Sequence, residues 1–185
     1  MQIKVAKSAG FCFGVKRAVG IAESYAEKGI PAVTLGEIIH NPTVVESLRR
    51  RGVLPIENID ECPKGATVIL RSHGVPLSVI EKLEEKGIPY EDATCPFVAR
   101  IHKIVAERTA AGDVVILTGN PGHAEVKGII GHAKGDVRVV RNLSELEKLT
   151  ENEKNLCANC YTLLSQTTFL RAEWEKCEKF AKRVY

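Results

Sequence analysis

Apolar and polar positions along the chain follow two alternating patterns. Short apolar runs are typical of β-strands, and longer stretches with apolar residues three and four positions apart are typical of α-helices. The strands predicted in this way cover residues 3–7, 31–36, 67–74, 88–95, 113–120, 136–140 and 161–168. The predicted helices cover residues 15–28, 42–51, 77–86, 97–111, 124–133, 144–149 and 170–183. Strands and helices therefore alternate along the whole chain.

This alternation predicts an α/β fold with mostly parallel sheets, because a helix is the usual connection between parallel strands. The run DVVILTGN is apolar through most of its length, as expected for a buried parallel strand. Helix ends are marked by Asn41 as a cap before Pro42 and by Gly87 as a stop. We expect an N-terminal strand followed by two similar small α/β lobes. Their bounds are residues 1–13, 14–95 and 96–185.

Composition narrows the function classes. The 185 residues include 26 Lys and Arg against 23 Asp and Glu, a net charge of +3, and aromatic residues make up 5%. These values argue against a dedicated nucleic-acid binder. No apolar run reaches the roughly 18 residues of a membrane span, and the N-terminus lacks the apolar stretch of a secretory signal. We therefore expect a cytoplasmic protein without nucleic-acid or membrane partners.

Reactive and polar side chains follow the predicted strands, at their carboxyl ends. They are Cys12, His40, His73, Cys95, His123, Thr167 and Thr168. In open α/β sheets the ligand site lies at the carboxyl ends of the strands, because loops and helix N-termini meet there. We therefore expect the cysteines and histidines of this set, together with Glu125, to converge on one cavity between the two halves.

Cys12 and Cys95 each lie between a predicted strand and the start of a helix. The helix dipole and the unpaired backbone N–H groups stabilise a thiolate at such a position. Taken singly, each cysteine is better explained as a buried small apolar residue. Six cysteines in a reducing compartment are poor disulfide candidates, and the nearby histidines favour ligation of a metal or a cluster.

The three strand-end histidines lie in turns rich in Gly, Pro and Asn. Imidazoles in such turns can donate to phosphate oxygens or ligate zinc, and the residues alone do not separate these two roles. Glu125 opens a predicted helix two residues after His123, where it could shuttle a proton. The hydroxyl of Thr167 or Thr168 could link that carboxylate to a substrate.

The remaining candidates have weaker signals. Cys157 and Cys160 form a CxxC that neither pairs with a second CxxC nor opens a helix, so a structural role is favoured over a metal or redox role. Cys62 and Cys177 are read as incidental. Lys16 and Arg17 are interpreted as a solvated helix face that could add to an anion-binding field. His102 and His132 are read as ordinary helix residues.

The motifs together resemble one enzyme family across nearly the whole chain. In order they are AGFCFGVKRAV, LGEIIHNPTVV, RSHGVP, DATCPFV, GHAEVKGIIG and SQTT. This set is similar to the 4-hydroxy-3-methylbut-2-enyl diphosphate reductases of the non-mevalonate isoprenoid pathway. The resemblance implies α/β domains arranged around a 4Fe–4S cluster. It also implies reductive removal of a hydroxyl from an allylic diphosphate, with ferredoxin or flavodoxin as a typical electron donor.

The resemblance assigns roles to individual residues. Cys12 and Cys95 match two of the three cluster cysteines of the family. His40, His73 and His123 match its substrate-pocket histidines. Glu125 matches the acid that serves proton delivery, and Thr167 matches the first Thr of Gln-Thr-Thr, which contacts the substrate hydroxyl.

Some family features differ here or are absent from the sequence. Ala124 replaces the Pro of His-Pro-Glu-Val. The third cluster cysteine, in a Cys-Asn-Ala-Thr context, and a diphosphate-binding Ser-x-Asn pair do not occur. The expectation is therefore a reductase without the third family domain, which would pack with the N-terminal strand. The alternatives are a non-catalytic metal-binding module of the same fold and, less well supported, a metal-dependent hydrolase of a small phosphate.

Overall fold

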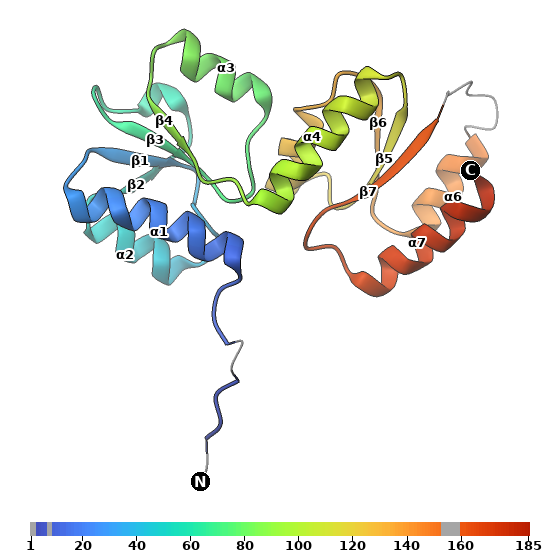
Figure 1. Ribbon diagram of the computed structural model, residues 1–185, viewed down its shortest axis with the longest axis horizontal. Coiled ribbons are helices and arrows are strands. Elements are labelled where there is room, and N and C mark those ends of the chain that lie inside the picture. The colour runs from blue at the N-terminus through green and yellow to red at the C-terminus, as the bar shows by residue number, and fades with distance from the viewer. Residues whose placement is uncertain (1–2, 7–8, 153–159) are drawn as a thin grey trace. The chain divides into compact units, whose positions relative to one another are not determined.

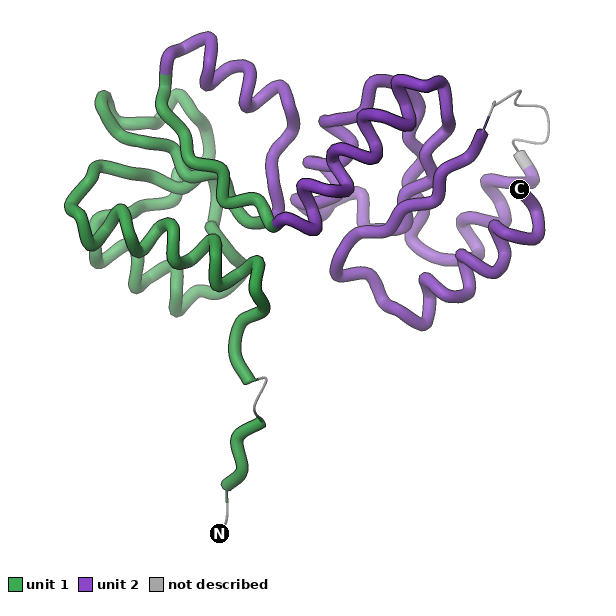
Figure 2. The backbone as a smooth tube through the Cα atoms, viewed as in Figure 1, with its two compact units in different colours: residues 1–72, 88–95 green, residues 73–87, 96–185 purple. Residues whose placement is uncertain are grey.

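The computed structural model describes residues 3–6, 9–152 and 160–185. It has the predicted α/β architecture, in which helices alternate with the strands of two parallel sheets (Figure 1). The chain divides into two compact units, shown in Figure 2. Unit 1 consists of residues 1–72 and 88–95, and unit 2 of residues 73–87 and 96–185.

Unit 1 is built on a four-stranded sheet with the strand order β2-β1-β3-β4. Its elements are α1 (Phe13–Lys28), β1 (Ala32–Leu35), α2 (Pro42–Arg50), β2 (Leu54–Ile56), the 3-10 helix η1 (Ile59–Glu61), β3 (Thr67–Leu70) and β4 (Tyr90–Asp92). All neighbouring strands are parallel. Ala18 and Ala22 of α1 and Leu48 of α2 pack with Ile69 of β3 in one buried cluster. Both helices therefore anchor to the sheet through their apolar stripes.

Unit 2 contains a three-stranded parallel sheet with the order β6-β5-β7. Its elements are α3 (Leu77–Glu85), α4 (Pro96–Ala110), β5 (Val114–Thr118), α5 (Ala124–Ile130), β6 (Val137–Val140), α6 (Leu143–Asn152), β7 (Tyr161–Ser165) and α7 (Arg171–Val184). Side chains alternate along the central strand: Val115 and Leu117 pack with α4 and α5, whereas Ile116 packs with α6 and α7. A fully buried β5 explains why its sequence lacks polar alternation.

Local sequence signals define several helix ends. The Asn41 side chain accepts a hydrogen bond from the Val44 N–H (3.2 Å) and caps α2, with Pro42 in the first turn as predicted. Gly87, with φ of 63°, follows α3 as its expected stop. Here the sequence pattern and the backbone geometry agree because each cap needs only neighbouring residues.

Two parts of the first half differ from the expected elements. Strand β2 was not predicted, because Pro55 lies at its centre; β2 is an edge strand, where a missing N–H is tolerated. Residues 3–6 were expected within a strand but form none, and Ile3 and Val5 are 76% and 79% exposed. A single extended segment gains no backbone hydrogen bonds until it pairs with another strand.

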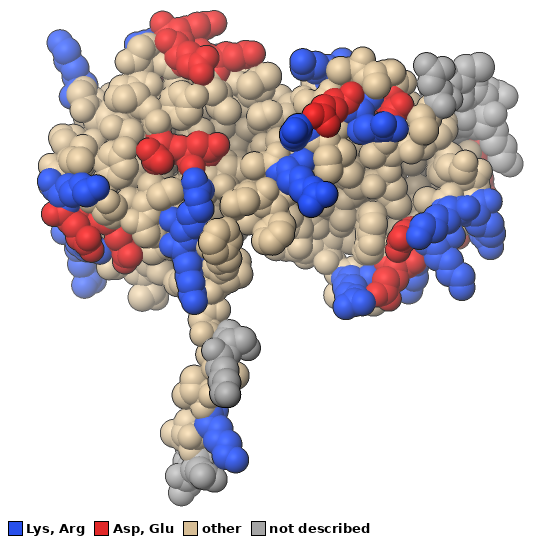
Figure 3. Space-filling model, viewed as in Figure 1, with Lys and Arg blue, Asp and Glu red and all other residues tan. Residues whose placement is uncertain are grey.

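Charged side chains are mixed over the visible face in Figure 3, in keeping with the small net charge. Along α7 the opposite charges pair within one turn, Arg171 with Glu175 (2.8 Å) and Lys182 with Glu178 (2.7 Å). Exposed pairs of this kind contribute little to stability. None of the helices in the described ranges combines the length and the apolar character needed to cross a bilayer.

Candidate functional site

The carboxyl ends of the strands in unit 1 are joined by backbone hydrogen bonds between their loops. Leu35, Leu70 and Asp92 end β1, β3 and β4 in register. Beyond them the Ser72 N–H donates to the Ile38 carbonyl (3.2 Å), and the Cys95 N–H donates to the Ser72 carbonyl (2.9 Å). The loops that carry His40 and Cys95 are therefore fixed to one another.

Cys12 and Cys95 lie at the same end of α1, although 83 positions separate them in the sequence. Cys12 is the N-cap residue of α1, and its thiol is exposed. Gly14, in the first turn of the same helix, packs so closely on Cys95 that an added Cβ would lie 2.5 Å from the Cys95 Sγ. The N-terminal end of a helix favours negative charge, so it is a suitable environment for thiolates.

Arg17 has a structural role that the sequence interpretation missed. Its guanidinium donates to the carbonyls of Thr94 (3.1 Å) and Asp92 (3.0 Å), immediately before Cys95. Helix α1 therefore holds the loop of the second cysteine as well as carrying the first. The interpretation of Arg17 as a solvated residue is wrong, since carbonyl groups 75 and more positions away cannot be recognised from a charge pattern.

His40 lies in the loop after β1 and is exposed. Its Nδ1 is 3.6 Å from a carboxylate oxygen of Glu37, one turn earlier in the same loop. The imidazole therefore has an acidic neighbour within unit 1.

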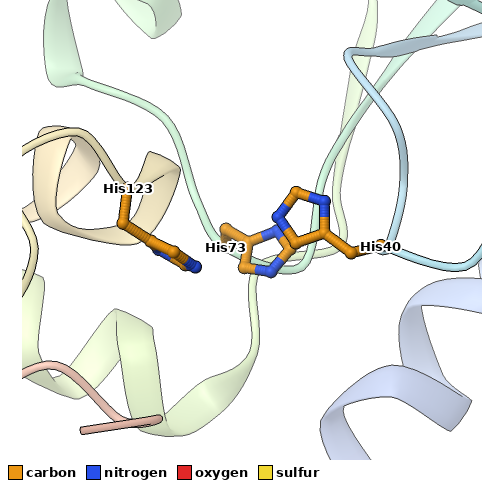
Figure 4. A group of neighbouring side chains, drawn as sticks. All are labelled: His40, His73 and His123. Atoms are coloured by element: carbon orange, nitrogen blue, oxygen red, sulfur yellow. The ribbon is translucent and has the colours of Figure 1, made fainter.

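In unit 2, His73 and His123 form an edge-to-face pair with ring centroids 5.5 Å apart. Figure 4 shows the His123 ring pointing toward His73. His123 is the N-cap of α5, and its Nδ1 accepts a hydrogen bond from the Glu125 N–H (3.1 Å). Because Nδ1 is the acceptor, the proton of the neutral ring is on Nε2.

Glu125 is 1% exposed and binds Thr167 through both carboxylate oxygens. One oxygen accepts from the Thr167 N–H (2.6 Å) and the other from the Thr167 hydroxyl (2.8 Å). The hydroxyl of Thr168 instead accepts from the Gln166 side chain (2.7 Å). Of the two threonines, Thr167 is therefore the one linked to Glu125.

A cleft of about 460 Å³ opens at the carboxyl edge of the unit 2 sheet. Its lining includes Asn120, His123, Arg141, Gln166, Thr168 and Leu170. The Gln166 side chain accepts from the Asn120 N–H (3.1 Å) and thereby connects the loops after β5 and β7. Gln166 was not singled out in the sequence, although its place at the end of a strand was a usable signal.

The structure thus brings together two sets of the predicted residues within single units. Cys12 and Cys95 lie at the N-terminal end of α1, and His73, His123, Glu125 and Thr167 gather around the start of α5. Convergence of both sets on one cavity stays a prediction. Cys157 lies outside the described residues; Cys160 is exposed, and its carbonyl accepts from the Val114 N–H next to β7.

These features define a class of α/β protein in which thiol, imidazole and hydroxyl side chains lie in the loops at the carboxyl ends of parallel strands. The chain belongs to the LytB protein family, whose profile matches residues 3–185. It is 42% identical over 179 residues to the 4-hydroxy-3-methylbut-2-enyl diphosphate reductase of Caldanaerobacter subterraneus, covering 95% of this chain and 60% of that protein. The reductase of Clostridioides difficile is 38% identical over 170 residues, which cover 91% of this chain and 59% of that protein.

Solved structures agree with this assignment. The (E)-1-hydroxy-2-methyl-but-2-enyl-4-diphosphate reductase of Plasmodium falciparum superposes with a TM-score of 0.85 at 28% identity, covering 96% of this chain and 55% of that one. A structure described as the terminal enzyme of the non-mevalonate pathway superposes with a TM-score of 0.83 at 36% identity, covering 98% and 64%. The chain therefore spans a little over half the length of these relatives.

Proposed function

We propose that this chain contributes to the reductive dehydroxylation of 4-hydroxy-3-methylbut-2-enyl diphosphate to isopentenyl and dimethylallyl diphosphate. The overall step breaks the allylic C–O bond: two electrons and two protons enter, and one water leaves. An external donor such as ferredoxin or flavodoxin supplies the electrons. The observation that carries the proposal is the bidentate contact between the buried Glu125 carboxylate and Thr167, beside the His73–His123 pair.

Cys12 and Cys95 are suited to hold a 4Fe–4S cluster as two of its ligands. Thiolates are the usual ligands of such clusters, and both cysteines are free and lie at the N-terminal end of α1. When bound, the cluster supplies electrons at low potential and a Lewis acid for the hydroxyl oxygen. The close approach of Gly14 to Cys95 favours this role, since a larger residue would displace the thiol.

The imidazoles are placed to bind and orient the diphosphate. His123 is a candidate donor to phosphate through Nε2, since its Nδ1 accepts from the Glu125 N–H. His73 lies beside it, and His40 belongs to the unit 1 loop at the level of Cys95. Charge-assisted donation to phosphate oxygens by such groups anchors the diphosphate end of the substrate, which restricts the orientation of the reacting hydroxyl end and lowers the entropic part of the barrier.

Glu125 and Thr167 form a route for the proton. The Thr167 hydroxyl donates to the carboxylate in the resting arrangement, so it can turn its lone pairs toward a substrate hydroxyl. A proton delivered to Glu125 can then pass through Thr167 to the departing oxygen. Burial of the carboxylate excludes bulk water from this route.

The test is anaerobic reconstitution of residues 1–185 with iron and sulfide, followed by metal and sulfide counting and a reductase assay with a strong artificial electron donor. The proposal expects cluster binding that Cys12→Ser and Cys95→Ser abolish. Cys62→Ser is the matched control, since that thiol lies against the carbonyls of Pro63 and Ala66 in a separate loop. Cluster binding that survives both substitutions contradicts the assignment of these ligands.

A second candidate is a non-catalytic metal-binding module of the same fold. The observation that favours it is that Cys12 and Cys95 are both free and lie at the N-terminal end of α1, where they could bind another thiophilic metal. Purified protein that contains zinc alone, takes up no cluster and binds no pyrophosphate would support this module over the reductase.

A further inference from the structure

The segment that carries His73 packs on helix α5 at Gly128 and on Gly131, just beyond the end of the helix. The helix begins after His123 and contains Glu125, and its other end is followed by Gly131 and His132. Residues 73–77 lead from His73 to the start of α3. Both segments belong to unit 2, so their contacts are part of one compact body.

Two glycines allow this segment to approach the helix backbone. A Cβ added at Gly128 would lie 3.5 Å from the His73 carbonyl oxygen, and one added at Gly131 would lie 2.6 Å from the Cα of Pro76. The Gly131 carbonyl also accepts a hydrogen bond from the Leu77 N–H (3.3 Å). Gly131 has an ordinary right-handed helical φ of −66°, so it is the close packing and not the backbone conformation that requires glycine there.

His132 adds a side-chain contact between these two points. Its Nε2 is 3.0 Å from the Val75 carbonyl oxygen. Because a carbonyl can only accept, this ring nitrogen carries the proton. One face of the His132 ring stacks on the ring of His102 in α4, with ring centroids 4.1 Å apart and planes at 19°. The stack holds the imidazole in the orientation that the hydrogen bond needs.

We propose that His132 is a positioning residue that holds the His73 segment on α5, so that one short helix sets the spacing of His73 from His123 for diphosphate binding. The role rests on the proposed function in so far as a diphosphate is the ligand. His132 itself touches the Val75 backbone and His102, not His73 or His123. Helix α5 has seven residues and rises about 10 Å. It can therefore carry His123 at its start while its far end holds the segment that leads from His73.

The first test needs no ligand. His132→Phe keeps a stacked ring but removes the donor, whereas His132→Gln is the matched control that keeps an N–H donor. Amide hydrogen exchange measured by NMR should be about three- to tenfold faster at Leu77 in the Phe variant, the range expected for one lost hydrogen bond, and close to wild type in the Gln variant. Gly131→Ala, which disturbs the same contact by bulk, should also accelerate it. Unchanged exchange at Leu77 in both the Phe and Ala variants would overturn the proposal.

The second test uses inorganic pyrophosphate as the probe and calorimetry of the 1–185 chain. His132→Phe should weaken binding several-fold, His132→Gln should restore it, and the Phe substitution should have no further effect in a His73→Ala background. If His132→Phe and His73→Ala weaken pyrophosphate binding by free energies that simply add in the double variant, His132 does not act through His73. If the wild-type chain fails to bind pyrophosphate, the proposed function loses its ligand, and the exchange measurement still decides the positioning role.

Discussion

Glu125 is a buried charge whose partners explain its burial. Removing a carboxylate from water is unfavourable unless hydrogen bonds replace its hydration, and the Thr167 N–H and hydroxyl do so at 2.6 and 2.8 Å. The same contacts aim the Thr167 hydroxyl at the carboxylate. These two hydrogen bonds satisfy the buried carboxylate, and they are also the contacts on which the proposed proton relay rests.

Glu125→Gln tests this relay in an active, cluster-loaded preparation. The amide keeps size and polarity but cannot deliver a proton, so turnover should fall by about 100-fold or more while pyrophosphate binding stays within a few-fold of wild type. Steady-state kinetics and calorimetry measure the two effects. Thr168→Val is the matched control, since its hydroxyl contacts Gln166 rather than Glu125. Normal turnover of the Gln variant would remove Glu125 from the mechanism.

Helix α1 shows how one element can serve packing and chemistry at different positions. Ala18 and Ala22 face the core, whereas the first turn contacts Cys95 through Gly14. Gly20 lies in the same helix with nothing within 4 Å of an added Cβ. Close packing therefore leaves no room for a side chain at Gly14, whereas there is room for one at Gly20.

We expect Gly20→Ala to raise the free energy of unfolding by about 0.5–1 kcal/mol, because alanine restricts the unfolded chain and favours the helix. Gly14→Ala should lower it and reduce iron uptake, because the new Cβ would lie 2.5 Å from the Cys95 Sγ. Urea unfolding and metal analysis of the two variants check this. A Gly14 variant as stable and as iron-loaded as the Gly20 variant would contradict the packing argument.

Cys177 of helix α7 packs against the sheet and is fully buried beside Ile116, Val140 and Leu146. Burial raises the pKa of the Cys177 thiol, and the nearby Glu173 adds to this effect. A group whose pKa is higher in the folded state stabilises the fold below its unfolded pKa, and this contribution is lost as the pH rises. Cys177, which the sequence analysis interpreted as incidental, therefore lies in the core, where a thiol behaves as a small apolar group.

The free energy of unfolding of wild type relative to Cys177→Ala should therefore decrease as the pH rises above about 8.5, the usual pKa of a free thiol. Urea unfolding of both proteins between pH 7 and pH 10 measures the difference, in which the other titrating groups cancel. A difference that does not change with pH would show that the thiol ionises equally well in the folded protein.

At the scale of the whole chain, each of the two units has its own sheet and its own set of candidate site residues. Unit 1 holds the two thiols at α1, and unit 2 holds the Glu125–Thr167 contact and two of the histidines. The chain spans 54% of the Geotalea daltonii reductase, at 44% identity.

We expect residues 1–185 alone to reduce the substrate poorly and to hold a cluster less firmly than a site with three cysteines, because cluster retention depends on the number and burial of the thiolates. The loss of iron to a chelator, followed by absorbance under anaerobic conditions, measures this. Cys160→Ser tests whether the CxxC supplies a replacement thiolate, since Cys160 is exposed. Stable, stoichiometric cluster and full turnover in the chain as given would contradict the expectation.

Several parts of the fold and site could be predicted from neighbouring residues alone. The alternation of strands and helices, the parallel sheets, the Asn41 cap and the location of His40, His73, Cys95, His123 and Thr167 after strands all follow from local spacing. The reason is that periodicity, capping and strand direction involve residues only a few positions apart. Cys12 is the exception, since residues 3–6 form no strand before it. The resemblance of the motifs to the reductase family is confirmed by the family match.

Other features depended on the tertiary structure, because they join residues far apart in the chain. The packing of Gly14 against Cys95, the Arg17 contacts to the loop before Cys95, the choice of Thr167 over Thr168 and the His132 contact to Val75 belong to this group. The sequence by itself determined which residue types stand at the strand ends. Only the folded sheets decided which of them touch, since register and helix packing bring together positions that no local pattern connects.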